Sequence, residues 1–173
     1  TELIEGRDNL PVTSWVPTAV SGVRGEPTLL SNAETYAQLA ALALGGVEVP
    51  GTAGEPGTRL LSIGEPDGDA RVVEVAHGTP WRDVLTPSEL DRPVLLGGFH
   101  GTWAPAGLLA GLTVSHADLT SAGLGLGAGV VLPLPDGTCP LRSTGAVLRY
   151  LARQSAQRCG PCRSGLPALA TAF

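Results

Sequence analysis

Two cysteines that enclose a glycine and a proline, Cys159-Gly160-Pro161-Cys162, constrain this chain more than any other feature. Gly-Pro favours a compact turn, so both sulfurs are directed to the same side of the backbone. Such a pair is either a dithiol redox motif or the beginning of a metal site. The third cysteine, Cys139, lies upstream of the pair and precedes a proline. An odd number of cysteines does not suit a disulfide framework, so we expect a reducing, cytoplasmic setting.

The sequence on both sides of the pair favours a metal site. A thioredoxin-type dithiol requires its first cysteine at the start of a helix that follows a buried strand. Here apolar residues at helical spacing predict one helix from about Leu141 to Ala156 and a second from Leu166 to Phe173, with the pair in the tight link between them. Iron–sulfur clusters and structural zinc usually take four ligands. The chain offers Cys159, Cys162 and, as a third candidate, Cys139.

Composition and charge exclude several functional classes. Hydrophobic residues make up 43% of the 173 residues, but no apolar run approaches the roughly 20 residues that span a bilayer. The net charge is -5, and all 11 basic residues are arginines scattered singly along the chain. We therefore expect neither direct membrane insertion nor nucleic-acid binding. The chain lacks methionine, so we expect a piece of a larger protein, in which Thr1–Gly6 is the tail of a helix.

Hydrophobic periodicity predicts the order of the elements. A helix from Thr28 to Leu44 is expected to end at Gly45-Gly46, and a loop follows to Gly57. Two alternating segments joined by a turn predict a β-hairpin. Thr79 before Pro80 predicts the N-cap of a short helix. The expected hairpin strands are Arg59–Gly64 and Arg71–Ala76, and the later elements are a helix Trp81–Leu85, a strand Pro93–Gly97, a helix Ser115–Ala122 and a strand Ala128–Leu134.

This order predicts an α+β fold: a β-grasp, or ubiquitin-like, mixed sheet flanked by an N-terminal helix and a C-terminal helical hairpin. The glycine-rich segment Gly123–Gly129 superficially matches a nucleotide-binding loop, but a strand rather than a helix is expected to follow it. Close backbone packing is therefore the expected reason for these glycines. The segment Gly97–Trp103 is expected to be a flexible loop that is able to contact a ligand or a partner.

Three stretches resemble, in order and spacing, the NADH-binding flavoprotein subunit of respiratory complex I. Residues 154–165, QSAQRCGPCRSG, resemble its cluster-binding motif S-C-G-x-C-x-P-C-R-x-G, which also occurs in NAD-linked hydrogenases and formate dehydrogenases. Residues 20–28, VSGVRGEPT, followed by SNAET at 31–35 resemble its S-G-x-x-G-x-P-T-x-x-N-N-V-E-T. Residues 122–129, AGLGLGAG, resemble its A-G-S-G-x-G-x-G segment.

The resemblance implies identities for three parts of the chain: the end of a flavin-binding region with one helix at 1–46, an SLBB-like β-grasp module at 56–136, and the start of a helical iron–sulfur domain at 137–173. Cys159 and Cys162 would bind a 4Fe-4S cluster. The family's main NADH and FMN phosphate loops would lie upstream of Thr1. The implied FMN-contacting residues in this chain are Leu30, Ser31, Asn32 and Thr35. Ser31 and Asn32, followed by Glu34, are also typical of a helix N-cap region without any ligand.

The departures from the family concern the cluster. Ala156 occupies the position of the family's first cluster cysteine, and the fourth ligand would lie beyond Phe173, so the ligand set in this chain is incomplete. We hypothesise that Cys139 replaces the missing ligand. The expected helix between Cys139 and the pair would be about 24 Å long, so it must fold back for both ends to meet one cluster.

The resemblance implies a fragment of an NADH:acceptor oxidoreductase subunit, of the NADH dehydrogenase (quinone) type, that passes electrons from NADH through FMN to an iron–sulfur cluster. Its partners would be other redox subunits or a ferredoxin-like acceptor, in the cytoplasm and either free or peripheral to a membrane complex. The fragment alone is expected to be inactive. The alternative is a non-catalytic β-grasp module that binds a ligand or a neighbouring protein and whose cysteine site holds zinc or is empty.

Overall fold

The computed structural model describes residues 16–45, 49–64 and 68–173, and the chain divides into two compact units, Thr1–Glu48 and Val49–Phe173. The helix tail expected at Thr1–Gly6 lies outside the described residues, as does part of the expected hairpin turn. The expected segments 56–136 and 137–173 share the second unit, and their separate identities stay a prediction. Among the helices in the described ranges, none is long and apolar enough to cross a membrane.

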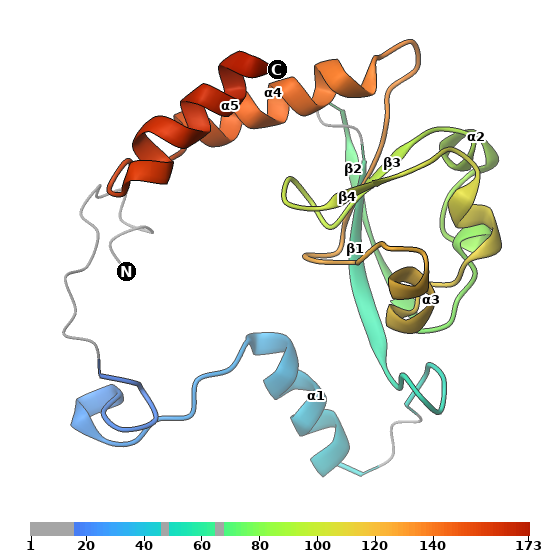
Figure 1. Cartoon of the computed structure of the whole chain (residues 1–173). Helices are drawn as coiled ribbons and strands as arrows, with labels where there is room; N and C mark the ends of the chain where they lie inside the picture. The colour runs from blue at the N-terminus through green and yellow to red at the C-terminus, as the bar shows by residue number, and fades with distance from the viewer. Residues whose placement is uncertain (1–15, 46–48, 65–67) are drawn as a thin grey trace. The chain divides into compact units, whose positions relative to one another are not determined.

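The first unit contains one turn and one helix. The 3-10 turn η1 (Val23–Gly25) is followed by α1 (Ala33–Ala43), which Figure 1 draws in blue. The expected start at Thr28 is wrong, because Asn32 has an extended backbone and caps the helix from outside. None of the residues of α1 is buried within this chain.

The second unit is built on a five-stranded mixed sheet in the order β2-β1-β5-β3-β4 (Figure 1). The central pair β1 and β5 is parallel, and the other three pairs are antiparallel. This arrangement confirms the predicted α+β fold with a β-grasp-like sheet. The strands are β1 (Thr58–Gly64), β2 (Ala70–Ala76), β3 (Val94–Leu96), β4 (Thr102–Ala104) and β5 (Val130–Pro133).

Strand β4 corrects the expectation of a flexible loop at Gly97–Trp103. Trp103 pairs with Leu95 of β3, so the segment is the turn and return strand of a second hairpin. Gly97 and Gly98 have φ values of 92° and 83°, which side chains rarely adopt, and they form the turn. The return strand has three residues, too few for an alternating pattern to be visible in the sequence.

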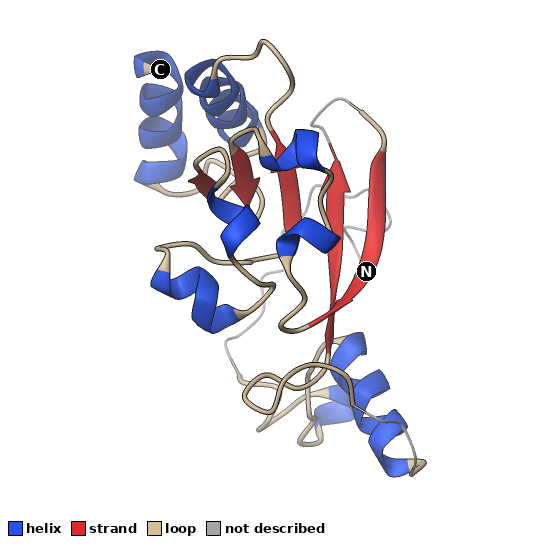
Figure 2. Cartoon of the chain, turned by 90° about the vertical axis from the view of Figure 1, so that its right-hand side faces the viewer, coloured by secondary structure: helices blue, strands red, loops and turns tan. Residues whose placement is uncertain are grey.

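Short helices cover one face of the sheet (Figure 2). They are η2 (Trp81–Asp83), α2 (Pro87–Leu90), η3 (Leu108–Gly111) and α3 (His116–Ser121). The predicted cap at Thr79 is wrong, because Pro80 precedes η2 and no side chain caps it. A capping box that was not predicted lies at Thr86 and Glu89 and starts α2. The core between sheet and helices is apolar, and its fully buried members include Leu61, Ile63, Trp81, Leu96, Leu119 and Val131.

The chain ends in the predicted helical hairpin. Helix α4 (Pro140–Arg153) is followed by a link, the π-helical turn η4 (Pro161–Gly165) and α5 (Leu166–Ala172). Helices α4 and α5 lie side by side in both views of the chain (Figures 1 and 2). Among the described residues of this hairpin, only Gly145 is buried.

Candidate functional site

The cysteine pair lies at the elbow between α4 and α5, as the sequence predicts. Cys159 directly precedes the helical segment that runs through η4 into α5, and its carbonyl oxygen accepts a hydrogen bond from Arg163 N at 2.9 Å. Cys162 lies one turn later, within η4. The preceding element is a helix and not a buried strand, so the setting is not that of a thioredoxin-type dithiol.

The two sulfurs face each other at the elbow. Both thiols are free, and their Sγ atoms are 2.9 Å apart in a shared hydrogen bond. Cys159 is exposed and Cys162 is half-buried. The hydrogen bond with the Cys162 thiol holds the pKa of Cys159 below its ordinary value, helped by the Cys162 backbone N–H. The same sulfur contact raises the pKa of Cys162. As pH rises, Cys159 therefore loses its proton before Cys162 does.

The link before the pair has a defined local structure. Ser155 Oγ donates to the carbonyl oxygen of Cys162 at 3.3 Å and accepts a hydrogen bond from Gln157 N at 3.2 Å. Gln157 has a φ of 55°, in the left-handed region that favours glycine. The motif that this link resembles has glycine at this position. The link thus keeps the backbone conformation that suits the motif's glycine, although Gln157 replaces that glycine and Ala156 replaces the motif's first cysteine.

Cys139 does not join the pair. It is exposed and precedes the first turn of α4, where the backbone N–H groups of Arg142 and Leu141 lower the pKa of its thiol. The pair follows the other end of this 14-residue helix, which is about 21 Å long. Within residues 16–45, 49–64 and 68–173 no three His, Cys, Asp or Glu side chains are grouped so that they could hold a metal ion. Cys159 and Cys162 therefore supply two of the four thiolates that such a site requires.

The segment before α1 forms a closed turn and a helix cap. Thr28 Oγ1 accepts from Val23 N at 2.9 Å and donates to the Glu26 carbonyl at 3.0 Å. Gly22 is required beside it, because a Cβ there would lie 2.4 Å from Thr28 Oγ1. Asn32 Oδ1 accepts from the backbone N and the Oγ1 of Thr35, at 2.8 and 2.9 Å. The expected N-cap role is therefore confirmed for Asn32. Leu30 and Ser31 are exposed beside it.

The glycine-rich segment packs against the β3–β4 turn. A Cβ at Gly127 would lie 2.8 Å from Gly97 Cα, and a Cβ at Gly97 would lie 3.3 Å from the carbonyl oxygen of Gly125. Strand β5 follows the segment. The expectation of close backbone packing is confirmed. The segment is not a nucleotide-binding loop of the helix-capping type, because a strand and not a helix follows it, as predicted.

Glu55 is an important residue that the sequence did not reveal. Its carboxylate accepts hydrogen bonds from Ser115 Oγ, His116 N and Ala117 N at 2.8 to 3.0 Å and thereby attaches the loop before β1 to the start of α3. These backbone N–H groups lower its pKa. His77 Nδ1 lies 3.5 Å away. Glu55 stands between glycines and prolines in the sequence, and no pattern connects it with residues sixty positions later.

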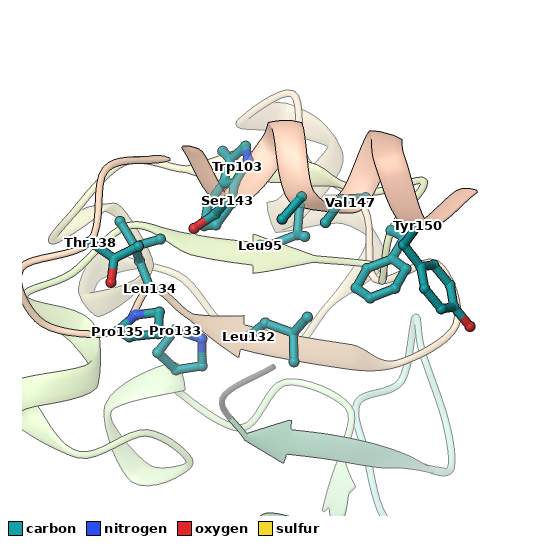
Figure 3. Close-up of a pocket in the computed structure, with 12 residues that line it drawn as sticks. Leu95, Trp103, Leu132, Pro133, Leu134, Pro135, Thr138, Ser143, Val147 and Tyr150 are labelled. Atoms are coloured by element: carbon teal, nitrogen blue, oxygen red, sulfur yellow. The ribbon is translucent and has the colours of Figure 1, made fainter. Parts of the chain in front are cut away.

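A cavity of about 700 Å³ lies between α4 and the open face of the sheet (Figure 3). Phe99, Trp103 and Tyr150 contribute aromatic walls. The sequence suggested that the segment of Phe99 and Trp103 meets a ligand or partner, but it gave no sign that Tyr150 of α4 lies opposite. The Phe99 and Tyr150 rings are in fact in edge-to-face contact, 5.4 Å between centroids.

Comparisons with known proteins agree with this geometry. The NADH-quinone oxidoreductase F subunit of Buchnera aphidicola (subsp. Schizaphis graminum) is 27% identical over 176 residues, which covers 95% of this chain and 39% of that protein. Its namesake in Salmonella typhimurium is 29% identical over 177 residues, with the same coverage. The chain therefore spans about two fifths of the length of these relatives. No protein-family model matches it.

A solved structure has the same fold. A chain in the crystal structure of an air-oxidised NAD+-reducing NiFe hydrogenase superposes on 98% of this chain with a TM-score of 0.71 and 24% identity, and the match covers 30% of that chain. The predicted resemblance to the NADH-binding flavoprotein of complex I is confirmed for a part of that protein.

Proposed function

We propose that this chain, which is similar over 95% of its length to part of the F subunits of NADH-quinone oxidoreductases, is a segment of an NADH:acceptor oxidoreductase subunit. The complete protein would pass electrons from NADH through FMN to an iron–sulfur cluster. The observation that carries the proposal is the elbow, where Cys159 and Cys162 face each other at 2.9 Å in the position of the cluster motif. The chain covers 39% of such a relative, so this activity belongs to the longer protein.

Cys159 and Cys162 would supply two thiolates to the cluster, which when bound takes up and releases single electrons. A thiol must lose its proton before it binds metal, and Cys159 loses its proton first because its pKa is lowered. The backbone at Cys162 is held in place by the hydrogen bond that its carbonyl oxygen accepts from Ser155 Oγ. Arg158 and Arg163 flank the pair, and their positive charges would offset part of the negative charge of the thiolates.

A four-ligand cluster needs two ligands besides Cys159 and Cys162. Cys139 is the third candidate, but it precedes α4 while the pair follows it, so a ligand role would require α4 to move relative to the elbow. A Cys139→Ser change in the full-length protein tests this. Loss of the cluster spectrum would make Cys139 a ligand, and an unchanged spectrum would place the remaining ligands outside the described residues.

The turn before α1 would serve the flavin. Asn32 fixes this turn through two hydrogen bonds to Thr35. Leu30 is 74% exposed and is available for an apolar contact. With Ser31, these residues would form the wall of a flavin site whose phosphate-binding part lies in the rest of the protein. Partners of the complete protein would be other redox subunits or a ferredoxin-like acceptor, and we place it in the cytoplasm, at the periphery of a membrane complex.

An anaerobic NADH titration of the full-length protein tests the function. The proposal predicts absorbance bands of flavin and of an iron–sulfur cluster, with bleaching of both when NADH is added. A protein whose spectrum does not respond to NADH would not be such an oxidoreductase.

One observation favours a second candidate: Ala156 stands where the motif has a cysteine. The second candidate is a β-grasp module without catalytic activity, in which the pair holds zinc or nothing. Metal analysis of the same preparation separates the two. Iron with inorganic sulfide supports the oxidoreductase, and zinc or no metal supports the module.

A further inference from the structure

The outer face of the sheet, opposite the short helices, carries apolar side chains. Leu132 of β5, Leu95 of β3 and Trp103 of β4 are neighbours across the paired strands and line the cavity under α4. Such a face requires a cover, because apolar surface is stabilised by removal from water. In this chain α4 lies over it, and Figure 3 shows Val147 of α4 directed toward Leu95 and Leu132.

Helix α4 is fixed over the sheet at two places and leaves a space between them. Near its N-terminal end, Trp103 Nε1 donates a hydrogen bond to Thr144 Oγ1 at 3.1 Å. Near its C-terminal end, the Tyr150 ring rests against Phe99 at an interplanar angle of 74°. Toward the sheet, the helix presents the small side chains of Ser143, just before the first support, and of Ala146, between the two supports, so it does not fill the space. The result is the cavity of about 700 Å³.

The chemistry of the lining restricts what can occupy this cavity. None of the twelve lining residues carries a charge, so an ionic group inside would lose part of its hydration and find no opposite charge among the lining residues. Three aromatic rings contribute to the walls, and such rings pack favourably against other flat rings. The hydroxyl groups of Thr138 and Ser143 provide polar contacts at one side. The volume lies in the range of about 300–1,000 Å³ that is typical of small-molecule sites.

We propose that the cavity between α4 and β3, β4 and β5 binds an uncharged small molecule with a flat ring system and one polar substituent. Its rings would lie among Phe99, Trp103 and Tyr150, and its polar group would face the hydroxyls of Thr138 and Ser143. The cysteine elbow follows α4, so a molecule under α4 would also fix the helix that leads to the elbow. The proposal does not rest on the oxidoreductase function and holds whether or not the elbow binds a cluster.

Equilibrium dialysis of the full-length protein against two naphthalene dyes tests this. The uncharged probe is 6-propionyl-2-dimethylaminonaphthalene, and the charged comparison is 1-anilinonaphthalene-8-sulfonate. We expect one uncharged dye per chain and binding of the sulfonate about tenfold weaker or more, a difference of about 1.4 kcal/mol. Equal binding of both dyes, or no binding of the uncharged dye, would overturn the proposal.

Two matched variants locate the dye. Val147→Phe places a ring in the cavity and should weaken binding of the uncharged dye about tenfold or more. Val72→Phe adds the same ring at a 65% exposed position of β2 and should leave the binding unchanged. If Val147→Phe fails to fold, judged by circular dichroism, Trp103→Phe serves instead, because it removes the hydrogen bond to Thr144 and part of the wall. Binding that survives in the folded cavity variant would overturn the proposal. So would self-association of the wild type through this face, measured by light scattering and abolished by the same variant.

Discussion

The sheet module and the cysteine elbow differ in what holds them together. The sheet and its short helices enclose an apolar core in which Leu61, Ile63 and Leu96 are fully buried. In the described residues of the helical hairpin only Gly145 is buried, and the elbow is shaped by hydrogen bonds such as that from Ser155 to Cys162. The module therefore has its own source of stability, whereas the elbow keeps its geometry through local backbone conformation and two thiols.

The largest expected effect concerns the apolar core of the sheet module. Leu96→Ala removes a fully buried side chain from β3 and should cost about 2–5 kcal/mol of unfolding free energy. Leu141→Ala makes the same change at a 66% exposed position of α4 and should change it by less than about 0.5 kcal/mol. Urea unfolding followed by circular dichroism measures both. Similar losses for the two variants would mean that the hairpin contributes to the core as the sheet does.

The next largest effect is on thermal stability, through the contact of Gly127 with Gly97. Gly127→Ala would bring a Cβ within 2.8 Å of Gly97 Cα at a φ of 47°, a left-handed conformation that alone costs about 1–2 kcal/mol. Gly125→Ala meets nothing within 4 Å and should be tolerated. Thermal unfolding of the two variants decides whether the loop packing matters. If Gly127→Ala is as stable as Gly125→Ala, the contact between these loops is not tight.

The pH dependence of stability provides a further test, through the carboxylate of Glu89. Two hydrogen bonds from Arg71 at 2.8 and 2.9 Å are the main cause that lowers the pKa of Glu89 from 4.5 to about 2. A lowered folded-state pKa stabilises the fold fully above the unfolded value, and this contribution disappears as pH falls from about 4.5 to about 2. The melting temperature of Glu89→Gln should therefore be lower than that of wild type at pH 6, and the difference should vanish toward pH 2.

The control for this experiment is Glu34→Gln, in the exposed first turn of α1. This variant removes one negative charge and leaves the Arg71–Glu89 pair intact. A Glu89→Gln protein that loses stability on acidification as steeply as wild type would show that the β2–α2 ion pair contributes nothing.

The smallest effect concerns the elbow itself. In metal-free protein at pH 7.5, iodoacetamide should modify Cys159 before Cys162, because the sulfur contact lowers the pKa of the first thiol and raises that of the second. Peptide mass spectrometry after brief exposure gives the order. Faster modification of Cys162 would contradict the arrangement of the two sulfurs.

The sequence predicted those parts of the molecule whose signals are local. The alternation of β1 and β2, the glycine stop after α1 and the helical spacing on both sides of the elbow correspond to observed elements. The start of α1 was wrong because apolar residues after Thr28 continue the helical pattern, whereas Asn32 offers the stronger cap. Strand β4 was missed because three residues show no period.

The candidate site was predicted in part for a similar reason. The sequence brings Cys159 and Cys162 together because only two residues separate them. It also predicted about 24 Å of helix between Cys139 and the pair, but not whether the chain folds back to bring them together, since that depends on the direction of a whole helix. The clamp of Glu55 on α3 and the cavity under Tyr150 depend on contacts between distant segments, which no local pattern records.

The iron content of the full-length protein, measured per chain together with inorganic sulfide, tests most directly whether the elbow is a cluster site. If the elbow binds a cluster, the wild type should contain iron and sulfide in equal amounts, and Cys159→Ser should lose both with an intact fold by circular dichroism. A wild-type protein without iron, or a Cys159→Ser protein with undiminished iron and sulfide, would contradict it.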